Sequence, residues 1–233
     1  MKKNLLFVLL FIIGCESSND SINLSSGNGF SSDFSSGSES STGIGGSMAR
    51  FTIVDDYLYT VDSWTLKSYD ISDQENPVHR DDVDLGWGIE TIFPYNGNLF
   101  IGAQSGMHIY DLEVKETPRW ISTYEHMTSC DPVVVQGDYA FVTLRGGTEC
   151  QGFSNQLDII DISELRNPLL LKTYPMINPH GLGVDENCLF ITEGEFGLKM
   201  YDISNLNNIE LIKHFEDINS VDVIPFMDVL MVI

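Results

Sequence analysis

A short motif that returns four times constrains the fold of this chain more than any other feature of its sequence. The motif is an aromatic or aliphatic residue, then Asp, then an aliphatic residue that is usually followed by Ser. Its four copies are centred on Asp70, Asp111, Asp161 and Asp202. These aspartates are 41, 50 and 41 residues apart, so the unit has about 41 residues and the third copy has an insertion of about nine. Such a period predicts one structural unit per copy, with neighbouring units covering each other's apolar faces.

Each copy divides into four short runs that are rich in β-branched and aromatic residues. In the first copy these runs are 51–54, 57–61, 66–71 and 78–83. Tight hairpin turns are predicted at Asp55-Asp56, Asn96-Gly97-Asn98, Gly137-Asp138 and Glu186-Asn187. The sequence therefore predicts an all-β fold, a β-propeller of four-stranded blades. A β-sandwich has strands of similar length, but it would not repeat the same aspartate.

The predicted propeller covers residues 48–233. We expect its blades at 48–86, 87–127, 128–177 and 178–217. Residues 218–233 resemble the first two strands of a fifth blade, so we expect an incomplete propeller and a sequence that is a fragment of a longer protein.

The second run of each copy resembles the strand that names the LVIVD-repeat proteins. The matching segments are Leu58-Tyr59-Thr60-Val61-Asp62, Leu99-Phe100-Ile101-Gly102, Ala140-Phe141-Val142-Thr143 and Leu189-Phe190-Ile191-Thr192. The resemblance extends over about Met48 to Ile233 and implies a bacterial surface propeller, frequently a lipoprotein. It implies little about activity, because most members are known by their repeat alone. The WD-repeat family fits less well, since the WD dipeptide and its Gly-His partner are absent from the sequence.

The N-terminus has the pattern of an export signal. Two lysines precede the apolar run Leu5 to Ile13, which is too short to span about 30 Å of hydrocarbon as a helix. We therefore predict a signal peptide over residues 1–14. The ending Ile12-Ile13-Gly14-Cys15 resembles a bacterial lipobox, although Ile12 stands where the family usually has Leu. The resemblance implies a lipid on Cys15 and a protein exported to the outer membrane, at the cell surface. The alternative is an ordinary secretory leader in which Cys15 has no role.

The segment that follows, within residues 15–47, is dominated by Ser and Gly and has few apolar residues. It cannot bury enough apolar surface to offset the entropy of ordering the chain, so we expect a disordered tether.

The acidity of the chain excludes some partners. A formal net charge of −22 argues against nucleic acid, because a nucleic-acid binder needs a basic surface. The acidity indicates either solubility or a surface that collects divalent cations, but no EF-hand loop is present. Hydrolase and metalloprotease motifs are also absent from the sequence. We therefore predict no catalytic residue, metal or cofactor.

Three cysteines remain in the propeller region. The hairpin around Gly137-Asp138 brings Cys130 and Cys150 close enough for a disulfide in an oxidising compartment, and the alternative is two free thiols. Cys188 lies in an apolar strand, where a buried, inert thiol is expected.

The first strands of propeller blades converge on a central channel. Alignment of the repeats places Arg50, Glu90, Asp131 and His180 at or within one residue of the same level, at one mouth of that channel. The mouth of the channel is then either a solvated polar opening without a binding role, or a site for a small ligand or a metal. The insertion Arg145 to Glu149 is expected to be a mobile surface loop, a common place for recognition.

These observations favour a non-catalytic surface lipoprotein that binds or scaffolds a protein or glycan partner and is held to the membrane by its lipid. The alternative is a propeller hydrolase or lyase that uses Glu90, Asp131 and His180, with or without a divalent ion. A third possibility is a purely structural part of an assembly. The fold itself does not distinguish among them.

Overall fold

The computed structural model describes residues 8–11, 46–126, 132–147, 154–227 and 229–233. Its regular elements are strands, and four sheets each contain four consecutive antiparallel strands. The first sheet contains β2 (Phe51–Val54), β3 (Tyr57–Val61), β4 (Thr65–Asp70) and β5 (Val78–Asp84). The second contains β6 (Ile89–Tyr95), β7 (Asn98–Ala103), β8 (Gly106–Asp111) and β9 (Arg119–Glu125). The third contains β10 (Val133–Gln136), β11 (Tyr139–Leu144), β12 (Gln156–Asp161) and β13 (Leu169–Pro175). The fourth contains β14 (Leu182–Asp185), β15 (Cys188–Thr192), β16 (Leu198–Asp202) and β17 (Glu210–Phe215).

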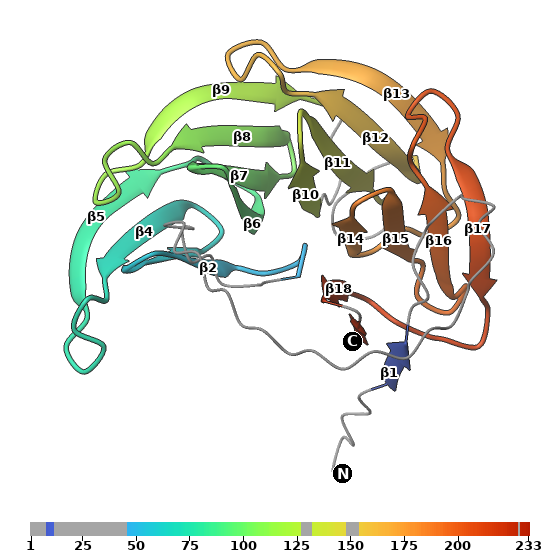
Figure 1. Cartoon of the computed structure of the whole chain (residues 1–233). Coiled ribbons are helices and arrows are strands. Elements are labelled where there is room, and N and C mark those ends of the chain that lie inside the picture. Colours follow the sequence, from blue (N-terminus) through green and yellow to red (C-terminus); the bar gives the residue numbers. More distant parts are fainter. Residues whose placement is uncertain (1–7, 12–45, 127–131, 148–153, 228) are drawn as a thin grey trace, which may run out of the picture.

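The sheets follow one another in an arc around a centre (Figure 1). The first strand of each sheet lies nearest the centre, and β2, β6, β10 and β14 pack each on the next. The fourth strands β5, β9, β13 and β17 form the outer rim (Figure 1). This is the arrangement of β-propeller blades, which confirms the fold predicted from the repeat.

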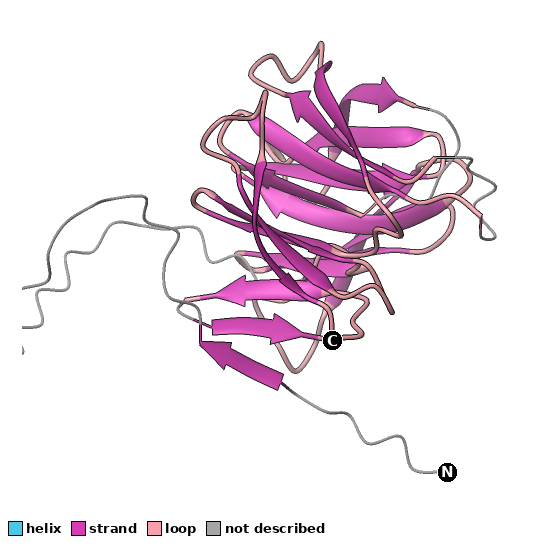
Figure 2. Ribbon diagram, turned by 90° about the vertical axis from the view of Figure 1, so that its right-hand side faces the viewer, coloured by secondary structure: helices cyan, strands magenta, loops and turns pink. Residues whose placement is uncertain are grey.

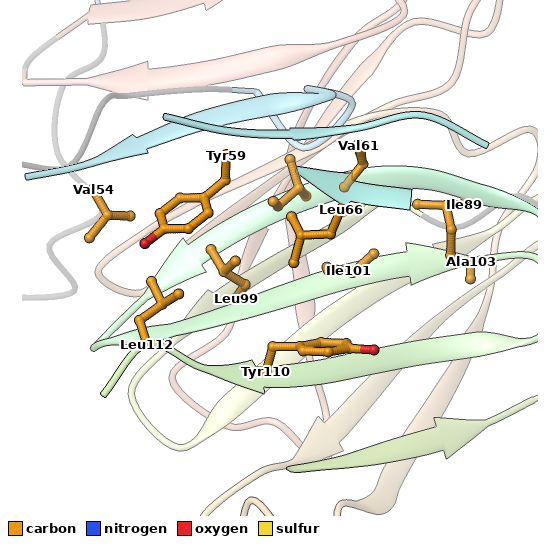
Figure 3. Packing of buried hydrophobic residues seen from close by; sticks show 11 residues of the cluster. Val54, Tyr59, Val61, Leu66, Ile89, Leu99, Ile101, Ala103, Tyr110 and Leu112 are labelled. Atoms are coloured by element: carbon orange, nitrogen blue, oxygen red, sulfur yellow. The ribbon is translucent and has the colours of Figure 1, made fainter. Parts of the chain in front are cut away.

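A separate apolar cluster fills each space between neighbouring sheets. Between the first two sheets, Tyr59 and Leu66 pack against Leu99 and Ile101 (Figure 3). In each copy, the second residue of the family-like segment is a fully or almost fully buried aromatic in the cluster that faces the next sheet. These residues are Tyr59, Phe100, Phe141 and Phe190. The aromatic position of the repeat therefore joins each blade to the following one.

The repeated aspartate has a structural role. Its carboxylate accepts a hydrogen bond from the main-chain N–H two residues later, as in Asp161 with Ser163 at 2.9 Å and Asp202 with Ser204 at 2.8 Å. The N–H of the intervening aliphatic residue donates to a carbonyl in the first turn of the same blade, as Ile162 does to Asp138 at 2.9 Å. The motif therefore ties the end of the third strand to the turn between the first two.

The turns between first and second strands lie where the sequence predicts them. Each has a residue in the left-handed region, with φ between 48° and 60°: Asp55, Asn96, Gly137 and Glu186. Two-residue hairpins need this conformation, because it matches the twist of the flanking strands.

A buried hydrogen-bond cluster joins distant parts of the chain at the centre. The Ser47 hydroxyl donates to Oδ1 of Asp222 at 3.0 Å and accepts from the Leu182 N–H at 2.8 Å. Burial raises the pKa of Asp222. Gly181 packs so closely here that an added Cβ would lie 2.1 Å from Asp222 Oδ1, so a side chain does not fit. The segment before β2 is thus fixed to the fourth sheet and to the residues that lead into the fifth.

The fifth sheet has three strands, in the order β1, β19 and β18. These are β1 (Val8–Phe11), β18 (Val223–Phe226) and β19 (Val229–Val232). They lie at the lower edge of the molecule in Figure 2. Part of the predicted signal peptide thus pairs with β19, Val8 opposite Val232, and covers main-chain groups that an edge strand leaves unpaired. The described residues include no helix of the length and apolarity needed to cross a membrane.

We expect Asp161→Ala to lower the free energy of unfolding by about 1–2 kcal/mol, because it removes the acceptor of two hydrogen bonds from Ser163. These bonds, first from the Ser163 side chain and then from its main chain, lower the pKa of Asp161. Their stabilisation is therefore present above the ordinary carboxyl pKa of about 4 and is lost as the pH falls through the lower folded value. Urea unfolding at neutral pH and at about pH 3 measures both effects. The control is Glu210→Ala, which removes an exposed carboxylate from β17. Equal losses in the two variants would contradict the structural role of Asp161.

Candidate functional site

The starts of the first strands surround a cavity of about 250 Å³. Its described lining residues come from all four blades: Met48, Arg50, Glu90, Thr91, Pro132, Arg145, Pro179 and His180. The structure thus brings together Arg50, Glu90 and His180, three of the four side chains predicted for the channel mouth. Asp131, the fourth, lies outside the described residues.

Arg50 connects the first blade to the second. Its Nε donates to the main-chain carbonyl of Glu90 at 3.1 Å, and its Nη2 donates to the carbonyl of Ile89 at 2.9 Å. The Glu90 carboxylate accepts a hydrogen bond from the Gln104 side chain at 3.2 Å. Both charged groups are therefore held in place by contacts within the protein.

Arg145 connects the third blade to the fourth. Its Nη1 lies 2.7 Å from Nδ1 and 2.9 Å from Nε2 of His180, so the guanidinium is in direct contact with the imidazole. The Asn178 amide lies 3.2 Å from Nε2. Burial, and then the charge of Arg145, lower the pKa of His180 to about 4, against an opposing effect of Glu193. The imidazole is therefore neutral at neutral pH and lies against the guanidinium of Arg145.

Arg145 is a member of the site that the repeat alignment does not reveal. The prediction that it belongs to a mobile surface loop is wrong for this residue. One feature of the sequence does indicate the position of Arg145, because this residue directly follows β11. The strands β10 and β11 are antiparallel and Val133 pairs with Val142, so the end of β11 lies beside the start of β10. Aligning only the starts of the first strands overlooks the ends of the second strands beside them.

A buried ion pair supports the connection that carries His180. Glu193 is fully buried, and Lys199 Nζ lies 2.5 Å from its Oε2. Oε1 of Glu193 accepts from the Ile177 N–H at 2.8 Å. The main chain of His180 is fixed separately, because its carbonyl accepts from Thr143 Oγ1 and its N–H donates to the Thr192 carbonyl, each at 2.7 Å. The imidazole is therefore held on a rigid support.

The structure changes one prediction about the cysteines. Cys188 is buried in the cluster between the fourth and fifth sheets, but it is disulfide-bonded, so the expected buried thiol is wrong. An apolar strand predicts burial of a cysteine but does not reveal a partner sulfur. Cys15, Cys130 and Cys150 lie outside the described residues.

The described side chains of this site offer hydrogen bonds and charge. Within the described part of the chain, no group of three or more His, Cys, Asp or Glu side chains is placed to hold a metal ion.

We expect the imidazole of His180 to take up its proton only near pH 4, and Arg145→Gln to raise that midpoint because it removes a nearby positive charge. An unfolded histidine has a pKa of about 6.5, so the unfolded chain binds the proton first. Stability from neutral His180 is therefore complete above about pH 6.5 and declines as the pH falls toward 4. A histidine NMR titration measures the midpoint. A wild-type midpoint near 6.5 would show that the ring is not held as described.

Comparisons with known proteins agree with this architecture. Residues 129–175, which contain the third sheet, match the family model of the LVIVD repeat. The search of curated proteins gave no match.

Solved structures that are similar in fold include the following two. One is a functionally unknown protein from Desulfotomaculum acetoxidans DSM 771, with a TM-score of 0.56 and 15% identity over 68% of this chain and 52% of that protein. The other is the computationally designed Ika8 protein, with a TM-score of 0.55 and 12% identity over 78% of this chain and 56% of that protein. The chain spans about half the length of both, and at these identities the likeness shows the fold alone. The chain therefore carries an LVIVD repeat, at residues 129–175, within a fold of β-propeller blades.

Proposed function

We propose that the protein is a cell-surface lipoprotein that binds a protein or glycan partner without catalysing a reaction, and that the channel mouth is its binding site. The observation that supports this proposal is the convergence of polar side chains from four blades on one cavity, namely Arg50, Glu90, Arg145 and His180. Concave sites with a few convergent polar groups are where proteins usually bind ligands.

The site is organised before a ligand arrives. Arg50 is fixed by two carbonyls, Glu90 by Gln104, and His180 by contacts of both its ring and its main chain. Side chains that are already ordered lose little entropy on binding, which favours affinity.

The alternative, a hydrolase or lyase, needs His180 as a base or as a metal ligand. Burial and then the positive charge of Arg145 lower the pKa of His180 to about 4, which makes the ring a weak base at neutral pH. The contacts of His180 thus favour binding over catalysis.

The leader supports a membrane anchor. The lysines at positions 2 and 3, the apolar run and Gly14-Cys15 together match the order of a lipoprotein signal, and acyl chains on Cys15 would supply the anchoring free energy. Cleavage before Cys15 would also remove β1 from the edge of β19. The Ser- and Gly-rich stretch would then hold the propeller away from the membrane surface.

We expect the mature wild-type protein in the membrane fraction with an acylated N-terminal peptide, and Cys15→Ala in the soluble fraction, because the variant cannot accept the lipid. Mass spectrometry of the N-terminal peptide, together with fractionation, measures this. Mass spectrometry of peptides prepared without reducing agent also identifies the cysteine that is bonded to Cys188. A bond from Cys188 to Cys15 in the mature protein would exclude the lipid and contradict the anchor.

We expect Met48→Trp to weaken binding about tenfold or more on an array of glycans and surface proteins, because Met48 is 40% exposed and lines the cavity, so the larger ring blocks it. The matched control is Glu75→Trp, an exposed position on the β4–β5 connection at the opposite end of the blade. Equal binding by both variants would place the ligand elsewhere. If the wild-type protein binds none of the probes, the binding function is contradicted. If the wild-type protein converts a probe into a product and His180→Gln does not, an enzyme is favoured.

A further inference from the structure

The outer strand of each blade has the same irregularity. The pairing between the third and fourth strands shifts by one residue in every blade, and the extra residue forms a β-bulge in the fourth strand. The residue directly after the bulge is, in chain order of the blades, Asp81, Ser122, Lys172 and Lys213. These four positions are equivalent in the fold. The third and fourth blades therefore have a lysine where the first blade has an aspartate.

The charges of these two lysines are not balanced by a carboxylate of the described residues. The other lysines of that part of the chain all form ion pairs with acidic side chains: Lys67, Lys115 and Lys199. Lys172 and Lys213 instead lie over the aromatic rings two residues later, with Nζ 5.9 Å from the ring centre of Tyr174 and 4.8 Å from that of Phe215. A cation–π contact attracts an ammonium group but leaves its net charge in place. Both lysines are therefore exposed positive charges.

Large apolar side chains flank these lysines on the same two strands. They are between 47% and 57% exposed, and they are Leu169, Leu170, Leu211 and Ile212. The strand β13 contains no acidic residue, and β17 contains one, Glu210, at its first position. The outer strand of the first blade, β5, instead contains three aspartates and one exposed large apolar side chain, Val78. We call the six residues Leu169, Leu170, Lys172, Leu211, Ile212 and Lys213 the basic rim.

The basic rim lies on the outside of the propeller, where a flat surface can contact it. The strands β13 and β17 are the outermost strands of their sheets and belong to neighbouring blades (Figure 1). A surface that approaches from outside meets both strands together.

Exposed apolar side chains beside lysines have the chemistry of a membrane-binding surface. The apolar groups enter the boundary between headgroups and acyl chains, and the long lysine side chains keep their charge at the level of anionic headgroups. A charge-neutral surface would leave the two ammonium groups without a partner. The local composition of the rim is therefore complementary to anionic lipid.

The net charge of −22 on the chain does not prevent this contact. Salt screens charges that lie more than about 8–10 Å apart. The repeated aspartate Asp161 pairs with Leu169, three residues before Lys172, which is about 10 Å along a strand. Asp158 is closer in the ladder, but it is buried and accepts hydrogen bonds from Gln156 and Thr173. The charge that a membrane meets at the rim is therefore set mainly by the two lysines.

We propose that the basic rim docks the propeller on an anionic lipid surface, with Leu170 and Leu211 at the acyl boundary and Lys172 and Lys213 against the lipid phosphates. This inference rests on the lipid anchor of the function proposed above, because a tether raises the effective concentration of the rim at the membrane. The docked propeller stands on its rim, so the cavity at the centre of the blades stays uncovered.

The test uses the acylated protein in vesicles of phosphatidylcholine alone or of equal parts of phosphatidylcholine and phosphatidylglycerol. Labelling with a neutral amine reagent, followed by mass spectrometry of the peptides, measures the accessibility of each lysine. We expect Lys172 and Lys213 to be labelled about fivefold or more slowly on the anionic vesicles, since one lysine near an anionic surface contributes about that factor. Lys67, on β4 of the first blade, is the internal control and should be labelled equally on both.

Two sets of variants separate docking from other causes of slow labelling. Leu170→Ser combined with Leu211→Ser should restore fast labelling, because the apolar side chains are lost, and both positions are exposed, so the fold is kept. The matched control is Val78→Ser, which removes an exposed apolar side chain from β5 and should leave the two lysines slowly labelled.

Equal labelling of an acylated protein on both kinds of vesicle would overturn the docking and leave the proposed anchor intact. Slow labelling that the double variant does not relieve would also overturn it. Slow labelling on both kinds of vesicle that increases with protein concentration would indicate a second copy on the rim in place of lipid. If the protein is found without an acyl group, the anchor fails, and the protein is added to the same vesicles from solution. Slow labelling there supports the docking by itself, and unchanged labelling overturns both proposals.

Discussion

Each four-stranded sheet is apolar on both faces, and the rest of the structure depends on the need to cover them. In β7, Leu99 and Ile101 pack toward the first sheet, while Phe100 between them packs toward the third. A single blade would leave both of these faces in water, at a cost of about 25 cal/mol for each Å² of exposed apolar surface. The sheets therefore stack side by side around a centre. This stacking brings the starts of four first strands, far apart in the sequence, to one cavity.

The blades separate structural and functional residues by position. At one end, the repeated aspartate and the aliphatic residue after it make the same contacts in each blade, for example those of Asp161 and Ile162. At the other end, the corresponding positions hold different side chains, including Arg50, Glu90 and His180. Residues that repeat therefore maintain the architecture, and residues that differ at equivalent positions give the mouth its chemistry.

Much of the fold was predictable because it depends on local pattern. The third strand of the first blade was predicted at 66–71 and lies at 65–70, and the hairpin turns lie at the predicted residues. Three residues of the channel mouth, Arg50, Glu90 and His180, could be predicted because the copies of the repeat can be aligned with one another. Arg145 could not, because it follows a second strand and reaches His180 of the next blade only in three dimensions. The bond of Cys188 and the contact of Ser47 with Asp222, 175 residues away, also have no signal in the repeat.

The contact of Ser47 with Asp222 links the architecture to the candidate site. Ser47 is bonded to the fourth sheet through Leu182 and to Asp222 before the fifth, and the next residue, Met48, lines the cavity, as does Arg50. Arg50 in turn holds the carbonyls of Ile89 and Glu90 in the second sheet. The chain that enters the first blade is thus fixed on both sides before β2 begins. The same hydrogen bonds that hold this segment at the centre of the propeller set the position of a guanidinium at its mouth, so the geometry of the site follows from how the blades are joined.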